Sequence, residues 1–266
     1  MTTMPIPDRG AVDSRQYRFA FAIDAFSAVP ADFVLPPDID AFDAGVFLPR
    51  DDADWLGRRK YPPRILLLRG REVLIVPHPA AGEHPVRIPL DRIERLEWGR
   101  ILLIGWIALT CDGGQIRLQY NTRSRGPVEQ CIKALQDRWL PPTPTNLTLF
   151  AGAFDVPLDL KFKYARSAEL LAGETPLAQF FQPPPAADLV LLTSRRLFWI
   201  TERRKGRYER YGTVSRSARL TSVTGVTCVD SKLAMLFKSG DSWCIPLREE
   251  QRQQVQQFAA RLEGGL

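Results

Sequence analysis

Residues 189–200 read LVLLTSRRLFWI, and residues 65–76 read ILLLRGREVLIV. The two segments align residue for residue, with Leu68 opposite Leu192, so they stand 124 residues apart. In each segment two apolar runs flank a short polar turn, which predicts a strand, a turn and a second strand. Recurrence of such a unit at a fixed spacing indicates an internal repeat.

The repeat continues beyond the aligned segments. Apolar residues at 107–109 and 233–235 precede turns at 112–114 and 239–241 that contain glycine, which predicts a further hairpin in each copy. The returning strands alternate apolar with mostly polar residues, as strands with one buried face do. Their apolar members are Ile116, Leu118 and Tyr120 in the first copy and Trp243, Ile245 and Leu247 in the second.

Each copy is expected to end in an amphipathic helix, because apolar residues recur there at spacings of three and four. These residues are Val128, Ile132, Leu135 and Trp139 in the first copy and Val255, Phe258 and Leu262 in the second. Pro127 suits the first turn of the first helix. The proline-rich residues 141–146 cannot continue it, so we expect one domain at 1–142 and another at 143–266.

A strand is also expected before each aligned segment, where apolar residues alternate with polar ones. The alternating residues are Tyr17, Phe19, Phe21 and Ile23 in the first half and Leu158, Leu160, Phe162 and Tyr164 in the second. The Asp- and Pro-rich stretch 29–54 has weak periodicity, so we expect a loop there with a short strand at 46–48. Trp106, Trp199 and Trp243 lie in strand patterns and are expected in the core.

These elements predict a mainly β fold with helices, of the α+β class. The strand–turn–strand of residues 191–197, with Thr193 and Arg195 in its turn, and the C-terminal helix resemble those of bacterial pleckstrin-homology-like (PH-like) and GRAM-type domains. Trp139 stands where that family often has a helix tryptophan. The resemblance implies two PH-like modules in a bacterial protein. Each would be a bent antiparallel sheet or partly open barrel capped by its C-terminal helix, and the first would carry an acidic N-terminal segment.

Charge is unevenly distributed along the chain. The net formal charge is +6, but residues 1–54 hold four Arg and ten Asp. Residues 195–219, in contrast, hold nine Arg or Lys and only two Glu. A turn at Gly206 would present several of these cations at one hairpin tip, and guanidinium groups can grip phosphate oxygens with two hydrogen bonds. The predicted anion-binding residues are Arg203, Arg204, Lys205, Arg207, Arg210, Arg195 and Arg196.

No motif for catalysis or for a cofactor is present. The sequence lacks a phosphate-binding loop, a dinucleotide-binding fingerprint and a nucleophile elbow, and its four cysteines include no C-x-x-C pair. His78 and His84 supply only part of a metal coordination set, and a polar turn explains them equally well. We therefore expect no metal and no cofactor. Carboxylate pairs could still meet in the folded chain, which keeps an enzyme with an unrecognised site among the alternatives.

These features predict a non-catalytic binding or scaffolding protein whose partner is another protein. The alternative is peripheral binding to anionic phospholipid through residues 203–210, unless that hairpin is merely solvated or docked on the acidic segment. Nucleic acid is less favoured, because Tyr208 and Tyr211 could stack on bases but no recognised signature accompanies them. With no secretory signal, and with the apolar run 101–111 too short to span a bilayer, we expect a cytoplasmic protein or one peripheral to the inner face of the membrane.

Overall fold

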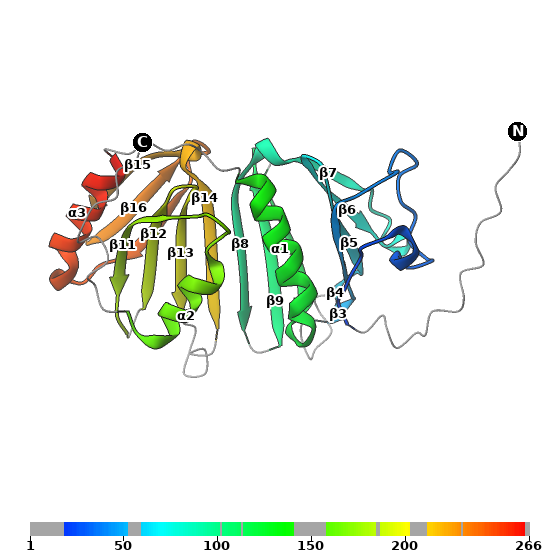
Figure 1. Cartoon of the computed structure of the whole chain (residues 1–266), viewed down its shortest axis with the longest axis horizontal. Coiled ribbons are helices and arrows are strands. Elements are labelled where there is room, and N and C mark those ends of the chain that lie inside the picture. Colours follow the sequence, from blue (N-terminus) through cyan, green and yellow to red (C-terminus); the bar gives the residue numbers. More distant parts are fainter. Residues whose placement is uncertain are drawn as a thin grey trace, which may run out of the picture. The chain divides into compact units, whose positions relative to one another are not determined.

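The computed structural model describes residues 19–52, 60–101, 103–112, 114–140, 158–184, 187–202, 212–229 and 231–263. Within these ranges the fold is mainly β, with three α-helices and four sheets (Figure 1). This content confirms the expected α+β class. Among the described helices, none is both long and apolar enough to cross a membrane.

Contacts between residues divide the chain into two compact units. Unit 1 consists of Met1–Leu90, Leu103–Gly105 and Leu118–Leu135, and unit 2 consists of Asp91–Leu102, Trp106–Arg117 and Gln136–Leu266. This division differs from the expected boundary between residues 142 and 143, because three segments of the first half (91–102, 106–117 and 136–142) group with the second half. The strand pairing of unit 2, described below, accounts for the difference.

Unit 1 contains a five-stranded antiparallel sheet in the order β1-β2-β5-β6-β7. Its strands are β1 (Phe21–Ala22), β2 (Ala44–Leu48), β5 (Arg64–Arg69), β6 (Glu72–Pro77) and β7 (Val86–Pro89), and a separate pair joins β3 (Asp51–Asp52) to β4 (Lys60–Tyr61). β5 and β6 form the predicted hairpin, turning at Gly70 with a φ of 53°. The short strand expected at 46–48 is confirmed as part of β2. Of the strand expected from Tyr17 to Ile23 only β1 forms, and Tyr17 lies outside the described residues.

The stretch expected as a loop contributes to the core of unit 1. The buried cluster comprises Ile23, Val29, Phe33, Ile39, Phe47, Ile65, Leu67, Leu74 and Val76. Three of these nine side chains, Val29, Phe33 and Ile39, come from the stretch expected as a loop, where the periodicity is weak. Irregular backbone therefore buries apolar side chains here without forming a strand.

The acidic residues of this stretch bind groups of the same unit. Asp32 contacts His78 at 2.9 Å, Asp38 pairs with Arg87 at 2.6 Å, Asp40 pairs with Arg69 at 3.1 Å, and Asp43 accepts a hydrogen bond from the Gly70 amide at 2.7 Å. These four aspartates are thus engaged within unit 1. Whether the rest of the acidic segment docks on residues 203–210 stays a prediction, since that hairpin lies outside the described residues.

A seven-stranded sheet joins strands from both halves of the sequence, in the order β10-β9-β8-β14-β13-β12-β11 (Figure 1). The strands are β8 (Ile93–Ile101), β9 (Ile104–Cys111), β10 (Gly114–Asn121), β11 (Pro176–Gln182), β12 (Asp188–Thr193), β13 (Arg196–Glu202) and β14 (Thr213–Arg219). β12 and β13 form the hairpin that the repeat predicts. β8 runs antiparallel to β14, with Glu97 opposite Arg216. This pairing places β8 in unit 2.

The C-terminal part of unit 2 is a second, three-stranded sheet followed by a helix. The sheet has the order β15 (Val223–Val229), β16 (Lys232–Phe237) and β17 (Ser242–Pro246), and α3 (Arg252–Glu263) packs on β15 and β11. β16 and β17 form the predicted hairpin. The helix expected in the first copy is α1 (Arg125–Trp139), and Val128, Ile132, Leu135 and Trp139 are all buried.

One predicted strand is wrong, because residues 160–169 form the helix α2 (Leu160–Glu169). The side chain of Asp159 accepts a hydrogen bond from the Phe162 amide at 2.9 Å and so caps the first turn. Leu158 and Phe162 are buried, whereas Leu160 is 67% exposed and Tyr164 is 69% exposed. The four alternating apolar residues thus do not share a buried face, and the two buried ones stand four apart, as on one side of a helix.

Candidate functional site

The predicted anion-binding residues fall into two groups. Arg203, Arg204, Lys205, Arg207 and Arg210 lie outside the described residues, so their role stays a prediction. Arg195 and Arg196 are described, and both are buried, with 7% and 0% of their surface exposed. Their position at the β12–β13 turn agrees with the sequence, but their environment does not suit a ligand.

Arg196 belongs to a buried ion pair. Its Nε donates to Oε1 of Glu174 at 2.8 Å and its Nη2 donates to Oε2 at 2.9 Å, so the pair is bidentate. Glu174 also accepts hydrogen bonds from the Thr193 hydroxyl at 2.6 Å and the Leu171 amide at 2.8 Å. The guanidinium group lies over the Phe198 ring, 4.5 Å from its centroid. Charge and hydrogen-bonding capacity are therefore satisfied inside the protein.

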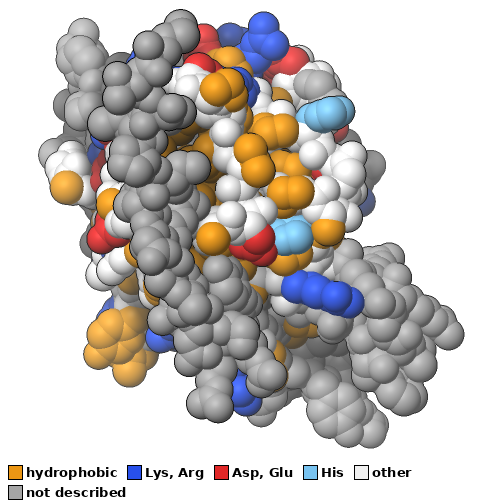
Figure 2. Space-filling model, turned by 90° about the vertical axis from the view of Figure 1, so that its right-hand side faces the viewer, with side chains coloured by type: hydrophobic (Ala, Val, Ile, Leu, Met, Phe, Trp, Pro, Cys, Tyr) orange, Lys and Arg blue, Asp and Glu red, His pale blue; other side chains and the backbone are white. Residues whose placement is uncertain are grey.

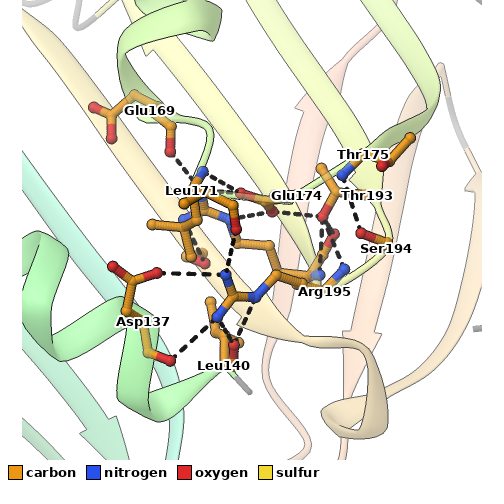
Figure 3. Close-up of polar contacts among 12 residues, drawn as sticks. Asp137, Leu140, Glu169, Leu171, Glu174, Thr175, Thr193, Ser194 and Arg195 are labelled. Carbon is orange, nitrogen blue, oxygen red and sulfur yellow. Dashed lines mark hydrogen bonds and ion pairs between the residues drawn. The ribbon is translucent and has the colours of Figure 1, made fainter. Parts of the chain in front are cut away.

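Arg195 binds the chain at the C-terminal end of α1 (Figure 3). Its Nε donates to the carbonyl oxygen of Leu140 at 2.6 Å, and its Nη2 donates to that oxygen and to the carbonyl oxygen of Asp137 at 3.1 Å. The Asp137 carboxylate lies 3.4 Å from Nη1. Cations suit the carbonyl end of a helix. Both guanidinium groups thus bind protein groups, and the role of Arg195 and Arg196 toward an external anion stays a prediction.

A groove in unit 2 lies between β17 and one face of the seven-stranded sheet. It consists of two adjoining hollows of about 650 and 410 Å³, which share Glu97, Trp199, Arg216 and Cys244. Ser242, Cys244 and Pro246 line it from β17, and the facing residues come from β8, β9, β10, β12, β13 and β14. We call this the β17 groove. Its volume is in the range of sites that bind small molecules or short peptide segments.

Arginine side chains lie over the aromatic rings that line this groove. The guanidinium carbon of Arg216 is 4.3 Å from a Trp199 ring centroid, and that of Arg117 is 4.8 Å from a Trp106 ring centroid. Arg216 is also paired with Glu97 at 2.8 Å. Arg117 forms no ion pair with a carboxylate of the described residues. The floor therefore combines aromatic surface with a cation, Arg117, whose charge no carboxylate of the described residues neutralises.

The backbone of β17 presents an unpaired edge to the groove. Phe237 donates to the carbonyl oxygen of Asp241 at 3.0 Å and Leu247 donates to that of Ser231 at 2.7 Å, which fixes the alternation of the β16–β17 ladder. Trp243 and Ile245 therefore bond to β16, whereas the amides and carbonyls of Ser242 and Cys244 point away from it. β17 is the last strand of its sheet. Pro246 closes the edge, because it lacks an amide hydrogen and its carbonyl accepts from Gln182 at 3.0 Å.

Comparison with known proteins adds no relative to this picture. No protein-family model matches the chain. No curated protein matches it either. The candidate site accordingly depends on its geometry and chemistry.

The predicted burial of the three strand tryptophans is confirmed, yet it does not describe them fully. Trp106 is 1% exposed, Trp199 8% and Trp243 7%, and each lines one or both hollows of the β17 groove. The Trp106 ring lies so close to β8 that a Cβ placed on Gly99 would come within 2.4 Å of it. These rings thus belong both to the core and to the groove floor.

His78, one of the two histidines, has a structural partner at each ring nitrogen. Nδ1 accepts a hydrogen bond from the Ala80 amide at 3.1 Å, and Nε2 lies 2.9 Å from the Asp32 carboxylate. A hollow of about 530 Å³ with Pro62 and Pro63 in its wall lies beside it, and Figure 2 shows histidine side chains next to hydrophobic ones on this face. In the described part of the chain, no group of three or more metal-binding side chains comes together.

The four cysteines differ in exposure. Burial raises the pKa of Cys131 to about 12, and burial followed by the nearby Asp112 and Glu94 charges raises the pKa of Cys111 to about 11. Cys244 is exposed at the edge of β17. An exposed thiol beside the groove gives a chemical probe of its occupancy.

Proposed function

We propose that the chain is a non-catalytic binding protein of two PH-like modules and that it binds an extended peptide along β17. The tandem arrangement is supported by elements that recur in one order, namely the hairpins β5–β6 and β12–β13, the hairpins β9–β10 and β16–β17, and the helices α1 and α3. The single observation that carries the peptide proposal is the open edge of β17 beside a groove. Strand edges of this kind receive peptides by adding one more strand to the sheet.

The geometry limits how such a peptide would bind. Only Ser242 and Cys244 offer backbone groups on the open side, so the added strand would be short, with Pro246 marking its end. Side chains of the peptide would point alternately toward the groove floor and toward solvent. Affinity would come from the few backbone hydrogen bonds and from contact with the aromatic floor.

The floor also indicates which side chain the peptide would carry. Arg216 is neutralised by Glu97, but Arg117 has no such carboxylate among the described residues. A guanidinium that lies over an indole can still donate hydrogen bonds to a carboxylate. We therefore expect peptides with Asp or Glu at a position that faces Arg117.

The proposal is tested with peptides selected from a random seven-residue display library on the full-length chain. Selected peptides should lose at least ten-fold in affinity for Cys244→Pro, which removes an outward-facing amide, and keep their affinity for Cys244→Ala. The native Pro246 shows that β17 accepts proline at a residue facing this edge. Arg117→Ser should weaken only peptides that contain an acidic residue.

A second measurement guards against misfolding of the proline variant. Peptides methylated on the backbone nitrogens of alternate residues should separate into two sets, and only the set whose methyl groups face β17 should lose binding to the unaltered chain. Equal binding of both sets, or selected peptides that bind Cys244→Pro like the unaltered chain, would show that the edge of β17 is not the site.

As an alternative, we propose peripheral binding to anionic lipid through residues 203–210, as the sequence predicts. These residues lie outside those that the structure describes. Replacing Arg203, Arg204, Lys205 and Arg207 with serine should abolish sedimentation with anionic vesicles if that hairpin is the lipid site. We further propose a cytoplasmic location, on the expectation drawn from the sequence.

A further inference from the structure

The turn between β8 and β9 has an unusual composition for a hairpin. Residues 101–104 read Ile-Leu-Leu-Ile, although hairpin turns normally carry Gly, Asn, Asp or Pro. Leu103 is 51% exposed and Ile104 is 36% exposed. Single exposed apolar residues need no explanation, but two adjacent ones at a hairpin turn that lacks the usual turn residues point to a contact.

Two arginines follow in the segment that is bonded to this turn. The amide of Thr122 donates a hydrogen bond to the carbonyl oxygen of Leu103 at 2.9 Å, which holds the start of α1 beside the apolar residues. Arg123 and Arg125 are exposed, and neither forms an ion pair with a described residue. All of these residues except Ile101 and Leu102 belong to unit 1. An apolar pair thus has free positive charge next to it.

We propose that Leu103 and Ile104 insert into an anionic lipid bilayer, with Arg123 and Arg125 binding the phosphate headgroups. An apolar side chain gains free energy in the acyl region, and arginine is attracted to anionic headgroups at its border. A bilayer fits this surface better than a protein does, because a stable protein interface buries about 800 Å² on each partner and two side chains supply only a small part of that. The site is independent of the β17 groove and of residues 203–210.

The test is sedimentation of the full-length chain with vesicles of phosphatidylcholine and phosphatidylglycerol at 3:1, compared with phosphatidylcholine alone. The chain should sediment with the anionic vesicles and lose that binding in high salt. Arg123→Ser with Arg125→Ser should lower the partition coefficient about thirty-fold, from the usual attraction of two arginines. Leu103→Ser with Ile104→Ser should lower it by about ten-fold or more.

Matched controls separate this site from other surfaces. Val34→Ser with Leu160→Ser removes two other exposed apolar side chains, of 72% and 67% exposure, and should leave binding unchanged. The Cys244→Pro variant should also bind vesicles normally. Leu103→Trp should be quenched by brominated lipid more strongly than the native tryptophans, which reports insertion directly.

Two results would overturn the proposal. One is the absence of sedimentation with anionic vesicles, including the case in which the turn mediates contact with a protein. The other is normal vesicle binding by the Leu103→Ser/Ile104→Ser variant while the serine variant of residues 203–207 loses it, which would assign lipid binding to that hairpin.

Discussion

Replacing Glu174 with alanine is expected to lower the free energy of unfolding of unit 2 by about 4 kcal/mol, because removing one member of a buried ion pair typically costs about 3–5 kcal/mol. Both side chains of the pair are 0% exposed. The change leaves the buried Arg196 guanidinium without its counter-charge and the Leu171 amide without its acceptor. Such unsatisfied groups account for most of the expected loss.

Urea denaturation followed by tryptophan fluorescence measures this effect. Five of the six tryptophans, at positions 98, 106, 139, 199 and 243, belong to unit 2, so the signal reports mainly on that unit. With a slope of about 2 kcal/mol per molar urea, the midpoint should fall by about 2 M. The double variant Glu174→Leu/Arg196→Met replaces the pair with apolar side chains of similar size and should recover the part of the loss that comes from the unpaired charge. The Leu171 amide still lacks its acceptor, so recovery should be incomplete.

Two outcomes would refute this reasoning. A loss below about 1 kcal/mol for Glu174→Ala would mean that the guanidinium finds other partners or water, against the cost expected for a buried unpaired charge. A double variant destabilised by the sum of the single changes would mean that packing, and not the pair itself, determines the effect of each change.

Three further predictions concern stability, reactivity and pH. The side-chain amide of Gln136 is buried, and its nitrogen and oxygen have no partner among the described residues. Gln136→Leu should therefore raise the free energy of unfolding by about 1 kcal/mol in the same urea assay. A lower free energy of unfolding would show that the amide does have a partner. With iodoacetamide at about pH 8, mass spectrometry should find Cys244 modified well before Cys131, whose pKa burial raises to about 12; equal rates would contradict the described burial. The hydrogen bond from Arg87 lowers the pKa of Asp38 below 3.8, so Asp38→Asn should be less stable than the unaltered chain at neutral pH. This difference in stability should disappear as the pH falls through the lowered pKa. Circular dichroism melts that show a pH-independent difference would exclude the ion pair as its cause.

Local patterns predicted most of the elements correctly. The hairpins at 65–76 and 189–200 follow from apolar runs around a polar turn, and the helices α1 and α3 follow from their apolar stripes. The strand predicted at residues 158–164 was wrong because two of the four alternating apolar side chains are exposed. The cap that starts the helix there depends on Asp159 alone. Alternation over four residues is weaker evidence than a cap followed by helix-forming residues.

Long-range pairing could not be predicted from such patterns. Nothing in the residues of β8 shows that Glu97 lies opposite Arg216, more than a hundred positions away. The same limit applies to the turn arginines, because the burial of Arg196 depends on Glu174, which no periodicity connects to it. Sequence patterns did not predict the β17 groove for this reason, although Arg95 and Glu97 alternate with apolar residues in β8 and so indicate one polar face.

The ladder between β8 and β14 makes the two halves of the sequence depend on each other. A break of the peptide bond between residues 142 and 143 would not yield two independent proteins, because six paired positions would still hold β8 of the first fragment against β14 of the second. The fragments made separately would each expose a bare strand edge and tend to aggregate. Made together they would complement one another through this ladder. Each fragment can therefore carry one half of a split fluorescent protein, which would fluoresce only after the fragments reassemble.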